Sequence, residues 1–216
     1  MRGVASAPAE FSGLHVLADD DPRWRNDPVA QALAACEGGA RVVQLRAKRA
    51  TDSQALAWGR EIRALSRAAS VVFVVNDRID LALACGADGV HLGQDDLPPA
   101  EARRIAPRLA IGRSMHERAQ LARALAEPID YVAYGPLFGT TSKQTRYAAR
   151  GLAALREIAS DCGKLPLIAI GGIDASNCAA VRAAGAQGFA VISAVANAAD
   201  ARAAVRELAA AWERAR

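Results

Sequence analysis

Short apolar segments alternate with helix-like segments along the whole chain, and this alternation constrains the fold more than any other feature. The apolar segments are 14–18, 42–46, 71–76, 89–93, 110–114, 131–135, 166–172 and 188–193. Most of the intervening segments repeat apolar residues at a spacing near 3.6, which is typical of helices. Strands separated by single helices must pair in parallel. Eight such units therefore predict a closed (β/α)₈ TIM barrel.

Glycines support these helix boundaries. Several expected helices end in a glycine-containing stretch before the next strand, as in EGGARVV, CGADGV and AAGAQGF. Glycine tolerates the left-handed conformation that closes a helix. A doubly wound open sheet is the alternative, but no G-x-G-x-x-G follows the first strand. No linker divides the chain, so we expect one barrel domain, 13–216, after a loose N-terminal tail, 1–12.

The charge of the chain does not indicate a nucleic-acid partner. The net charge is +4, yet basic residues alternate with acidic ones in the expected helices and only 5% of residues are aromatic. No apolar run is long enough to cross a bilayer, and the N-terminus does not resemble a signal peptide. The four cysteines are scattered, which favours a reducing, cytoplasmic protein without a zinc site. We expect small-molecule partners, and a homo-oligomer is compatible with the sequence.

The second apolar segment carries an unexpected polar face. In VVQLRAK, Gln44, Arg46 and Lys48 occupy alternate positions, so they share one face of a strand. Both faces of a parallel sheet are normally covered. In a barrel, catalytic groups project from the C-terminal ends of the strands. We therefore expect these three residues to face an anionic ligand.

Carboxylates follow the next two strands. Asp77 follows the third apolar segment, and Asp95 and Asp96 follow the fourth. Carboxylates on neighbouring loops, close to cations, are expected where Mg²⁺ binds a polyphosphate. The alternative is that Asp77 caps the helix near Arg78 and that Asp95 or Asp96 caps the helix after Pro98. The spacing does not choose between Asp95 and Asp96.

The last three strands are followed by features that favour phosphate. The sixth loop, 135–151, contains Thr140, Thr141, Ser142 and Lys143, which combine short hydroxyl donors with a point charge. The seventh strand ends in GGID and the eighth in ISAVANA. Barrels commonly bind phosphate at these last two positions. Two anion clusters result, so we expect one substrate with a diphosphate and another with a monophosphate.

The motifs QLRAK, NDR, GADGVHLGQDD, GPLFGTTSK, AIGGI and AVIS, in this order, resemble the thiamine phosphate synthase family over residues 14–194. The resemblance implies a Mg²⁺-dependent (β/α)₈ barrel. It also implies a transferase that joins 4-amino-2-methyl-5-(diphosphooxymethyl)pyrimidine to a thiazole phosphate, which gives thiamine phosphate and pyrophosphate. The family is thought to form a pyrimidine carbocation that the thiazole nitrogen captures, so no general base is required.

The resemblance also implies a role for each motif residue. Those implied for the pyrimidine diphosphate are Gln44, Arg46, Lys48, Asn76, Ser114 and Lys143. Those implied for the thiazole phosphate are Thr140, Ser142, Gly172, Ile192 and Ser193. The implied Mg²⁺ ligands are Asp77 and Asp96, which selects Asp96 over Asp95. We expect catalytic roles for Arg46, Lys48, Lys143 and Ser114. The three cations would stabilise the charge that develops on pyrophosphate.

Two departures keep other functions open. The sixth loop has Ser142 where the family pattern has threonine, although the hydroxyl is kept. IGRSMH resembles a sister family, the thiazole tautomerases, which use a histidine after the fifth strand, here His116. We favour the alternative that His116 is a partly exposed residue at the start of a helix, and we expect His91 to be buried and hydrogen-bonded. A phosphosugar isomerase would not need two anion clusters. A non-catalytic thiazole-phosphate-binding regulator would not need the pair Asp77 and Asp96.

Overall fold

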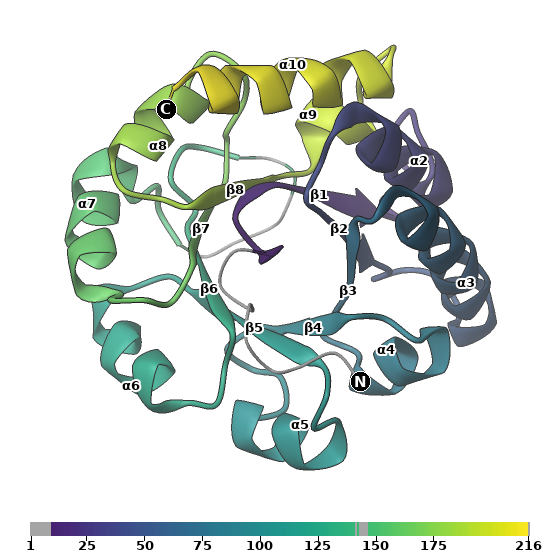
Figure 1. The fold of residues 1–216 in the computed structure, drawn as a ribbon, viewed down its shortest axis with the longest axis horizontal. Coiled ribbons are helices and arrows are strands. Elements are labelled where there is room, and N and C mark those ends of the chain that lie inside the picture. Colours follow the sequence, from purple (N-terminus) through teal and green to yellow (C-terminus); the bar gives the residue numbers. More distant parts are fainter. Residues whose placement is uncertain (1–9, 141, 143–146, 216) are drawn as a thin grey trace.

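The computed structural model describes residues 10–140, 142 and 147–215. Within these residues, eight parallel strands close into a barrel in chain order, each paired with the next and β8 with β1 (Figure 1). The strands are β1 (Gly13–Asp19), β2 (Val42–Arg46), β3 (Val72–Asn76), β4 (Gly89–Leu92), β5 (Ala110–Met115), β6 (Tyr131–Tyr134), β7 (Leu167–Ile170) and β8 (Gly188–Val191). The predicted (β/α)₈ barrel is confirmed.

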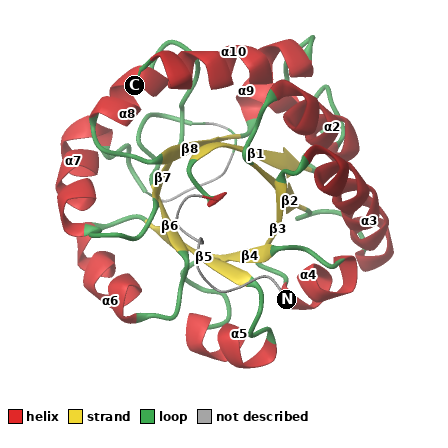
Figure 2. Cartoon of the chain, viewed as in Figure 1, coloured by secondary structure: helices red, strands yellow, loops and turns green. Residues whose placement is uncertain are grey.

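The helices form a ring outside the barrel (Figures 1 and 2). They are α2 (Pro28–Gly38), α3 (Asp52–Ala69), α4 (Ile79–Cys85), α5 (Pro99–Ile105), the 3₁₀ helix η1 (Arg118–Gln120), α6 (Leu121–Ala126), α7 (Gly151–Asp161), α8 (Cys178–Ala183), α9 (Ser193–Ala196) and α10 (Ala201–Arg214). Gly39 and Gly86 close α2 and α4 with φ of 96° and 65°, as the glycine stretches predict.

The alternation in β2 places its residues as expected. Val43 and Leu45 pack in the large core between the sheet and the helices. Val42, on the opposite face, belongs to a smaller core that also contains Leu17, Val74 and Ile168. Because successive side chains of a strand point to opposite faces, Gln44 shares the barrel-interior face with Val42. The polar face of this strand therefore points into the barrel.

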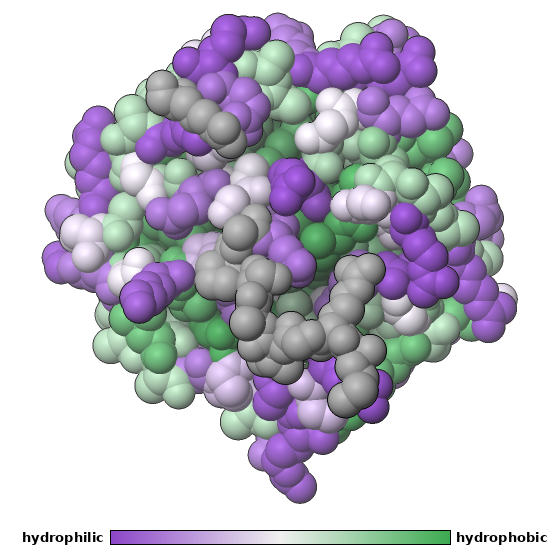
Figure 3. All heavy atoms as spheres, in the orientation of Figure 1, coloured by the Kyte–Doolittle hydropathy of each residue, from purple (hydrophilic) through white to green (hydrophobic). Residues whose placement is uncertain are grey.

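On the face shown in Figure 3, hydrophilic side chains are distributed around the helical rim and do not gather in one patch. This distribution fits solvated helix surfaces with interleaved charges. Within the described part of the chain, no helix combines the length and apolar character needed to cross a membrane.

Phe11 belongs to the barrel core, although we expected it in a loose tail. Its side chain is 2% exposed and stacks on Tyr131 with ring centroids 4.7 Å apart. Its carbonyl accepts a hydrogen bond from Nε2 of His15 at 2.7 Å. Residues 1–9 of the predicted tail lie outside the described residues. We keep the division into a tail and one barrel domain as a proposal, with Phe11 on the barrel side.

His15 makes the stability of the barrel depend on pH. Burial lowers the pKa of His15 to about 4 from an ordinary value of 6.5, against the opposing effect of its hydrogen bond to Phe11. Between these values the unfolded chain binds the proton and the folded chain does not, so stability falls as pH drops from 6.5 to 4. The contribution is roughly 3 kcal/mol over this window.

We expect urea unfolding of His15→Gln to vary less with pH between 6.5 and 4 than that of the wild type. His116→Gln, at a partly exposed position, serves as the matched control, and a larger change of slope in His15→Gln than in this variant assigns the dependence to His15. Equal slopes in the wild type and His15→Gln would show that another group governs this dependence.

Candidate active site

A cavity of about 530 Å³ opens at the C-terminal ends of the strands. All of the predicted site residues that the structure describes line this cavity. They are Gln44, Arg46, Lys48, Asn76, Asp77, Asp96, Ser114, Thr140, Ser142, Gly172, Ile192 and Ser193. Thr141 and Lys143, which we also expected to contact phosphate from the sixth loop, lie outside the described residues. Side chains from strands far apart in the sequence thus meet in one place, as the barrel topology predicts.

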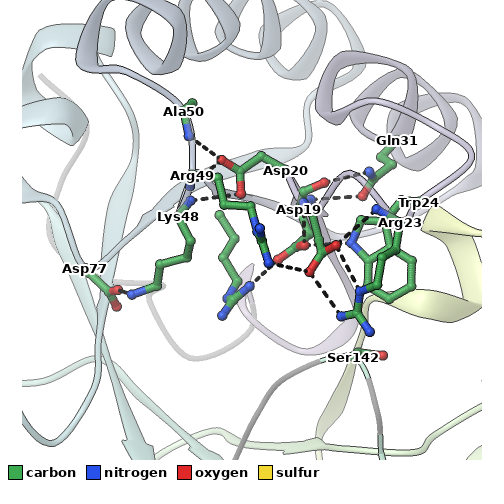
Figure 4. A network of polar contacts seen from close by, with 12 residues as sticks. Asp19, Asp20, Arg23, Trp24, Gln31, Lys48, Arg49, Ala50, Asp77 and Ser142 are labelled. Carbon is green, nitrogen blue, oxygen red and sulfur yellow. Dashed lines mark hydrogen bonds and ion pairs between the residues drawn. The ribbon is translucent and has the colours of Figure 1, made fainter.

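A buried carboxylate orients Arg46. The side chain of Asp19, at the end of β1, is fully buried and forms an ion pair with the guanidinium of Arg46. The indole Nε1 of Trp24 donates to the same carboxylate at 2.6 Å. Gln31 exchanges hydrogen bonds of 2.9 Å with the backbone of Asp19. Figure 4 shows Trp24 and Gln31 gathered around Asp19. The Asp19 carboxylate therefore holds the Arg46 guanidinium in a fixed orientation at the cavity.

A second carboxylate fixes the loop that carries Lys48. Asp20 accepts hydrogen bonds from the backbone N–H groups of Lys48, Arg49 and Ala50, at 2.9, 2.7 and 2.8 Å. The Lys48 ammonium extends from this loop to Asp77, with which it forms an ion pair (Figure 4). The predicted cation and the predicted metal ligand are thus already in contact.

Asp77 and Asp96 form a carboxylate pair. Burial is the main cause that raises the pKa of Asp96, and the neighbouring Asp77 carboxylate is the second. The Gly93 N–H and Lys48 oppose this shift. The backbone N–H of Gly93 donates to Asp96 at 2.6 Å. Asp77 adopts an uncommon positive φ of 64°. Two neighbouring, partly buried carboxylates form a site that attracts a cation.

The alternative that these aspartates cap helices is wrong. The N-cap residue of α4 is Arg78, and that of α5 is Pro98, and neither helix has a side-chain capping bond. Asp96 instead closes back on Gly93, in its own loop.

Arg113 supports the loop that carries Asp96. Its side chain is only 1% exposed, and its guanidinium donates to the carbonyl of Gly93 and pairs with Glu127 at 3.4 Å. Burial lowers the pKa of Arg113, against the attraction of Glu127. Arg113 therefore ties the β4 loop to β5, next to the carboxylate pair.

The monophosphate side is built from closely packed backbone. Gly171 and Gly172 have φ of 102° and 67°, so they leave the strand in which we had placed them. The N–H of Phe138 donates to the carbonyl of Gly171 at 3.0 Å. A Cβ atom at Gly172 would lie 2.6 Å from the carbonyl oxygen of Gly139. The sixth and seventh loops are therefore in direct contact.

The hydroxyl groups of this side lie at the same rim. Ser142 is buried, and its N–H donates to Oγ1 of Thr140 at 3.2 Å. Ile192 ends the eighth strand region, and the exposed Ser193 begins α9. The structure thus brings together the described residues that we expected at the thiazole phosphate.

His116 packs against the sixth loop. Its ring stacks on Tyr147 with centroids 4.1 Å apart, and Nδ1 lies 2.6 Å from the carbonyl oxygen of Gly135. Since a carbonyl only accepts, Nδ1 carries the proton. The imidazole thus helps to hold the two ends of the sixth loop, and it also lines the cavity.

Three supporting residues were not found from the sequence. In the sequence, Asp19 is one of several consecutive acidic residues, Arg113 is a charged residue within an expected strand, and Tyr131 is a single aromatic residue. None of these patterns indicates a role at the site. Their roles depend on which residues lie opposite one another across strands, such as Asp19 beside Arg46. Only the strand register, which periodicity does not supply, could have identified them.

Comparisons with known proteins agree with this geometry. The family model for thiamine monophosphate synthase matches residues 14–195. A thiamine-phosphate synthase of Anaeromyxobacter dehalogenans is 48% identical over 97% of this chain and 91% of its own length. One from Thermus thermophilus is 45% identical over 90% of this chain and 94% of its own.

Solved structures support the same relationship. A thiamine phosphate pyrophosphorylase from Pyrococcus furiosus superimposes with a TM-score of 0.87 and 37% identity, over 97% of this chain and 99% of that one. A 3-hexulose-6-phosphate synthase, with a TM-score of 0.63 and 19% identity, shows the shared barrel fold alone. On the extent of the family match and the identity to its members, the chain belongs to the thiamine monophosphate synthase family.

Proposed function

We propose that this chain joins 4-amino-2-methyl-5-(diphosphooxymethyl)pyrimidine to a thiazole phosphate, with Mg²⁺, and releases thiamine phosphate and pyrophosphate. The observation that carries the proposal is the pairing of Asp77 and Asp96 beside Lys48, in the same cavity as the glycine backbone and hydroxyls of the last three loops. One side suits a metal-bound diphosphate, and the other suits a monophosphate. The family relationship and the shared cavity support this assignment.

The donors present fit Mg²⁺. Hard cations of this kind take oxygen ligands, and Mg²⁺ commonly uses one or two carboxylates together with water and substrate phosphates. Asp77 and Asp96 would supply two carboxylates and leave coordination positions for water and the substrate phosphates. Burial and the neighbouring Asp77 raise the pKa of Asp96, and a bound cation would oppose this shift by favouring the charged carboxylate. When bound, Mg²⁺ supplies charge neutralisation to the diphosphate.

The protein groups then act on a simple substitution. The bond between the pyrimidine methylene carbon and the diphosphate oxygen breaks, and its electron pair leaves with pyrophosphate. Arg46, Lys48 and Lys143 stabilise this leaving group. The lone pair of the thiazole nitrogen forms the new bond to the methylene carbon, so no base is needed. Gln44, Asn76 and Ser114 orient the pyrimidine.

The remaining residues place the nucleophile. Thr140, Ser142, Gly172, Ile192 and Ser193 hold the thiazole phosphate, which brings the ring nitrogen toward the methylene carbon. The described cysteines are free thiols, and we propose a cytoplasmic location because such thiols suit a reducing compartment.

The function is tested by mixing the purified protein with both phosphorylated substrates and Mg²⁺. Thiamine phosphate is then assayed by oxidation to fluorescent thiochrome. We expect a signal that EDTA abolishes and that added Mg²⁺ restores. A folded, Mg²⁺-supplied protein that forms no product would refute the synthase.

His116 distinguishes the synthase from a thiazole tautomerase. Because its Nδ1–H is held by Gly135 and its ring by Tyr147, we expect His116→Ala to change synthase turnover by less than about tenfold, the order expected for a lost packing and hydrogen-bond contact. A tautomerase would lose its acid-base group, worth about 10²–10⁴-fold. Parallel thiochrome and thiazole-isomerisation assays of the variant separate the two.

A further inference from the structure

Three side chains on neighbouring strands form a hydrogen-bond chain beneath the cavity. The hydroxyl of Tyr131 on β6 lies 3.0 Å from Nδ1 of His91 on β4. Nε2 of His91 lies 2.9 Å from Oγ of Ser114 on β5. Tyr131 and His91 are 1% and 7% exposed, and all three residues line the cavity. The buried residues thus connect the barrel interior to a residue expected at the pyrimidine.

Gly112 makes this chain possible. The register pairs His91 with Gly112 and Gly112 with Tyr131, so the three residues form one row across β4, β5 and β6. A Cβ atom at Gly112 would lie 2.4 Å from Nδ1 of His91 and 2.5 Å from the Tyr131 hydroxyl. The glycine therefore leaves the space in which the histidine and the tyrosine meet.

The chain has a definite direction. Burial raises the pKa of Tyr131 far above its ordinary value, so the phenol keeps its proton and is a donor. Among the described residues, the structure gives this hydroxyl Nδ1 of His91 as its hydrogen-bond partner, at 3.0 Å. Buried hydroxyls donate where an acceptor is available. The ring proton of His91 is then on Nε2, and this N–H donates a hydrogen bond to Oγ of Ser114. The Ser114 hydroxyl proton is left to point into the cavity.

We propose that Tyr131 and His91 are positioning residues that fix Ser114 as a hydrogen-bond donor to a ring nitrogen of the pyrimidine, and that this polarity selects a 4-aminopyrimidine over its 4-oxo analogue. The proposal rests on the proposed function. In the aminopyrimidine, the ring nitrogen beside the amino group accepts a hydrogen bond. In the oxo analogue, the same nitrogen carries a hydrogen, and a donor opposite it has no partner.

Gln44 does not provide this selection by itself. Its Oε1 is buried without a hydrogen-bond partner among the described residues, so it is available to accept from the amino group. An amide, however, can turn to present either its oxygen or its NH₂ group. A free serine hydroxyl is equally adaptable. The hydrogen-bond chain from Tyr131 occupies Oγ of Ser114 as an acceptor. The Ser114 hydroxyl is therefore fixed as a donor toward the substrate.

The first test reads the histidine tautomer directly and does not depend on activity. The protein has three histidines, so the ¹⁵N signals of their imidazole rings can be assigned with single variants. We expect the His91 proton on Nε2 in the wild type, and a shift of the population toward Nδ1–H in Tyr131→Phe. Tyr134→Phe removes a buried phenol from the same strand that does not line the cavity, and it should leave the signal unchanged. A wild-type Nδ1–H tautomer would overturn the proposal.

The second test measures specificity. The ratio of the dissociation constants of the 4-oxo and 4-amino pyrimidine diphosphates, from calorimetry with Mg²⁺, should fall about tenfold in Tyr131→Phe, the factor expected for one net hydrogen bond. Tyr134→Phe should keep the wild-type ratio. An unchanged ratio in Tyr131→Phe, with the tautomer altered, would refute the selection. Loss of the proposed function itself would appear separately, as absent thiochrome product with both pyrimidine affinities intact.

Discussion

Asp96→Asn is expected to lower Mg²⁺-dependent product formation by about a hundredfold or more. The estimate follows from the several kcal/mol that a catalytic metal contributes to a charged transition state. Asparagine keeps an oxygen that can accept a hydrogen bond from the Gly93 N–H, but it removes the negative charge that, with Asp77, would bind the cation. Thiochrome assays over a range of Mg²⁺ concentrations measure the effect.

The neighbouring aspartate provides the matched control for this experiment. Asp95→Asn removes the same charge one residue away and should leave the Mg²⁺ dependence near that of the wild type. Without Mg²⁺, Asp96→Asn should unfold at the same or a higher urea concentration than the wild type, because it relieves repulsion between two carboxylates. A larger effect of Asp95→Asn on Mg²⁺ dependence would reverse our assignment of the ligand.

Asp19→Ala is expected to reduce the free energy of unfolding by about 3–5 kcal/mol, the usual cost of removing one partner from a buried ion pair. The Asp19 side chain is fully buried, and that of Arg46 is only 13% exposed. The substitution also leaves the indole N–H of Trp24 without its acceptor. Urea unfolding monitored by circular dichroism gives the change directly.

Asp21→Ala is the control for Asp19→Ala. The Asp21 side chain is 13% exposed, but its partners Arg23 and Arg49 are 57% and 62% exposed. Because the guanidinium groups of these pairs reach solvent, each pair contributes up to about 1 kcal/mol, so this variant should lose less stability than Asp19→Ala. If both variants lost similar stability, the loop as a whole, rather than the buried pair, would be responsible.

The barrel could be predicted because its signals are local. Periodicity marks strands and helices, glycines such as Gly39 and Gly86 mark helix ends, and parallel pairing follows from single-helix connections. The gathering of Arg46, Lys48, Asp77 and Asp96 followed from the same topology, because every strand delivers its C-terminal end to one face.

The supporting contacts could not be predicted because they depend on alignment between strands. Nothing in the local sequence distinguishes Asp19, which is buried against Arg46, from Asp21, which pairs at the surface. Phe11 was misplaced for a similar reason. A single aromatic residue before the first strand carries no periodicity, and its burial depends on the space left beside Tyr131.

The close contact at Gly172 limits how this gene can change. Every missense change of one base in a glycine codon introduces a side chain, and the smallest of these, alanine, already places a carbon 2.6 Å from the backbone oxygen of Gly139. The positive φ adds a further penalty for any L-residue. Every single-base missense change at position 172 therefore has a steric cost, whereas exposed positions on helix surfaces accept many different side chains.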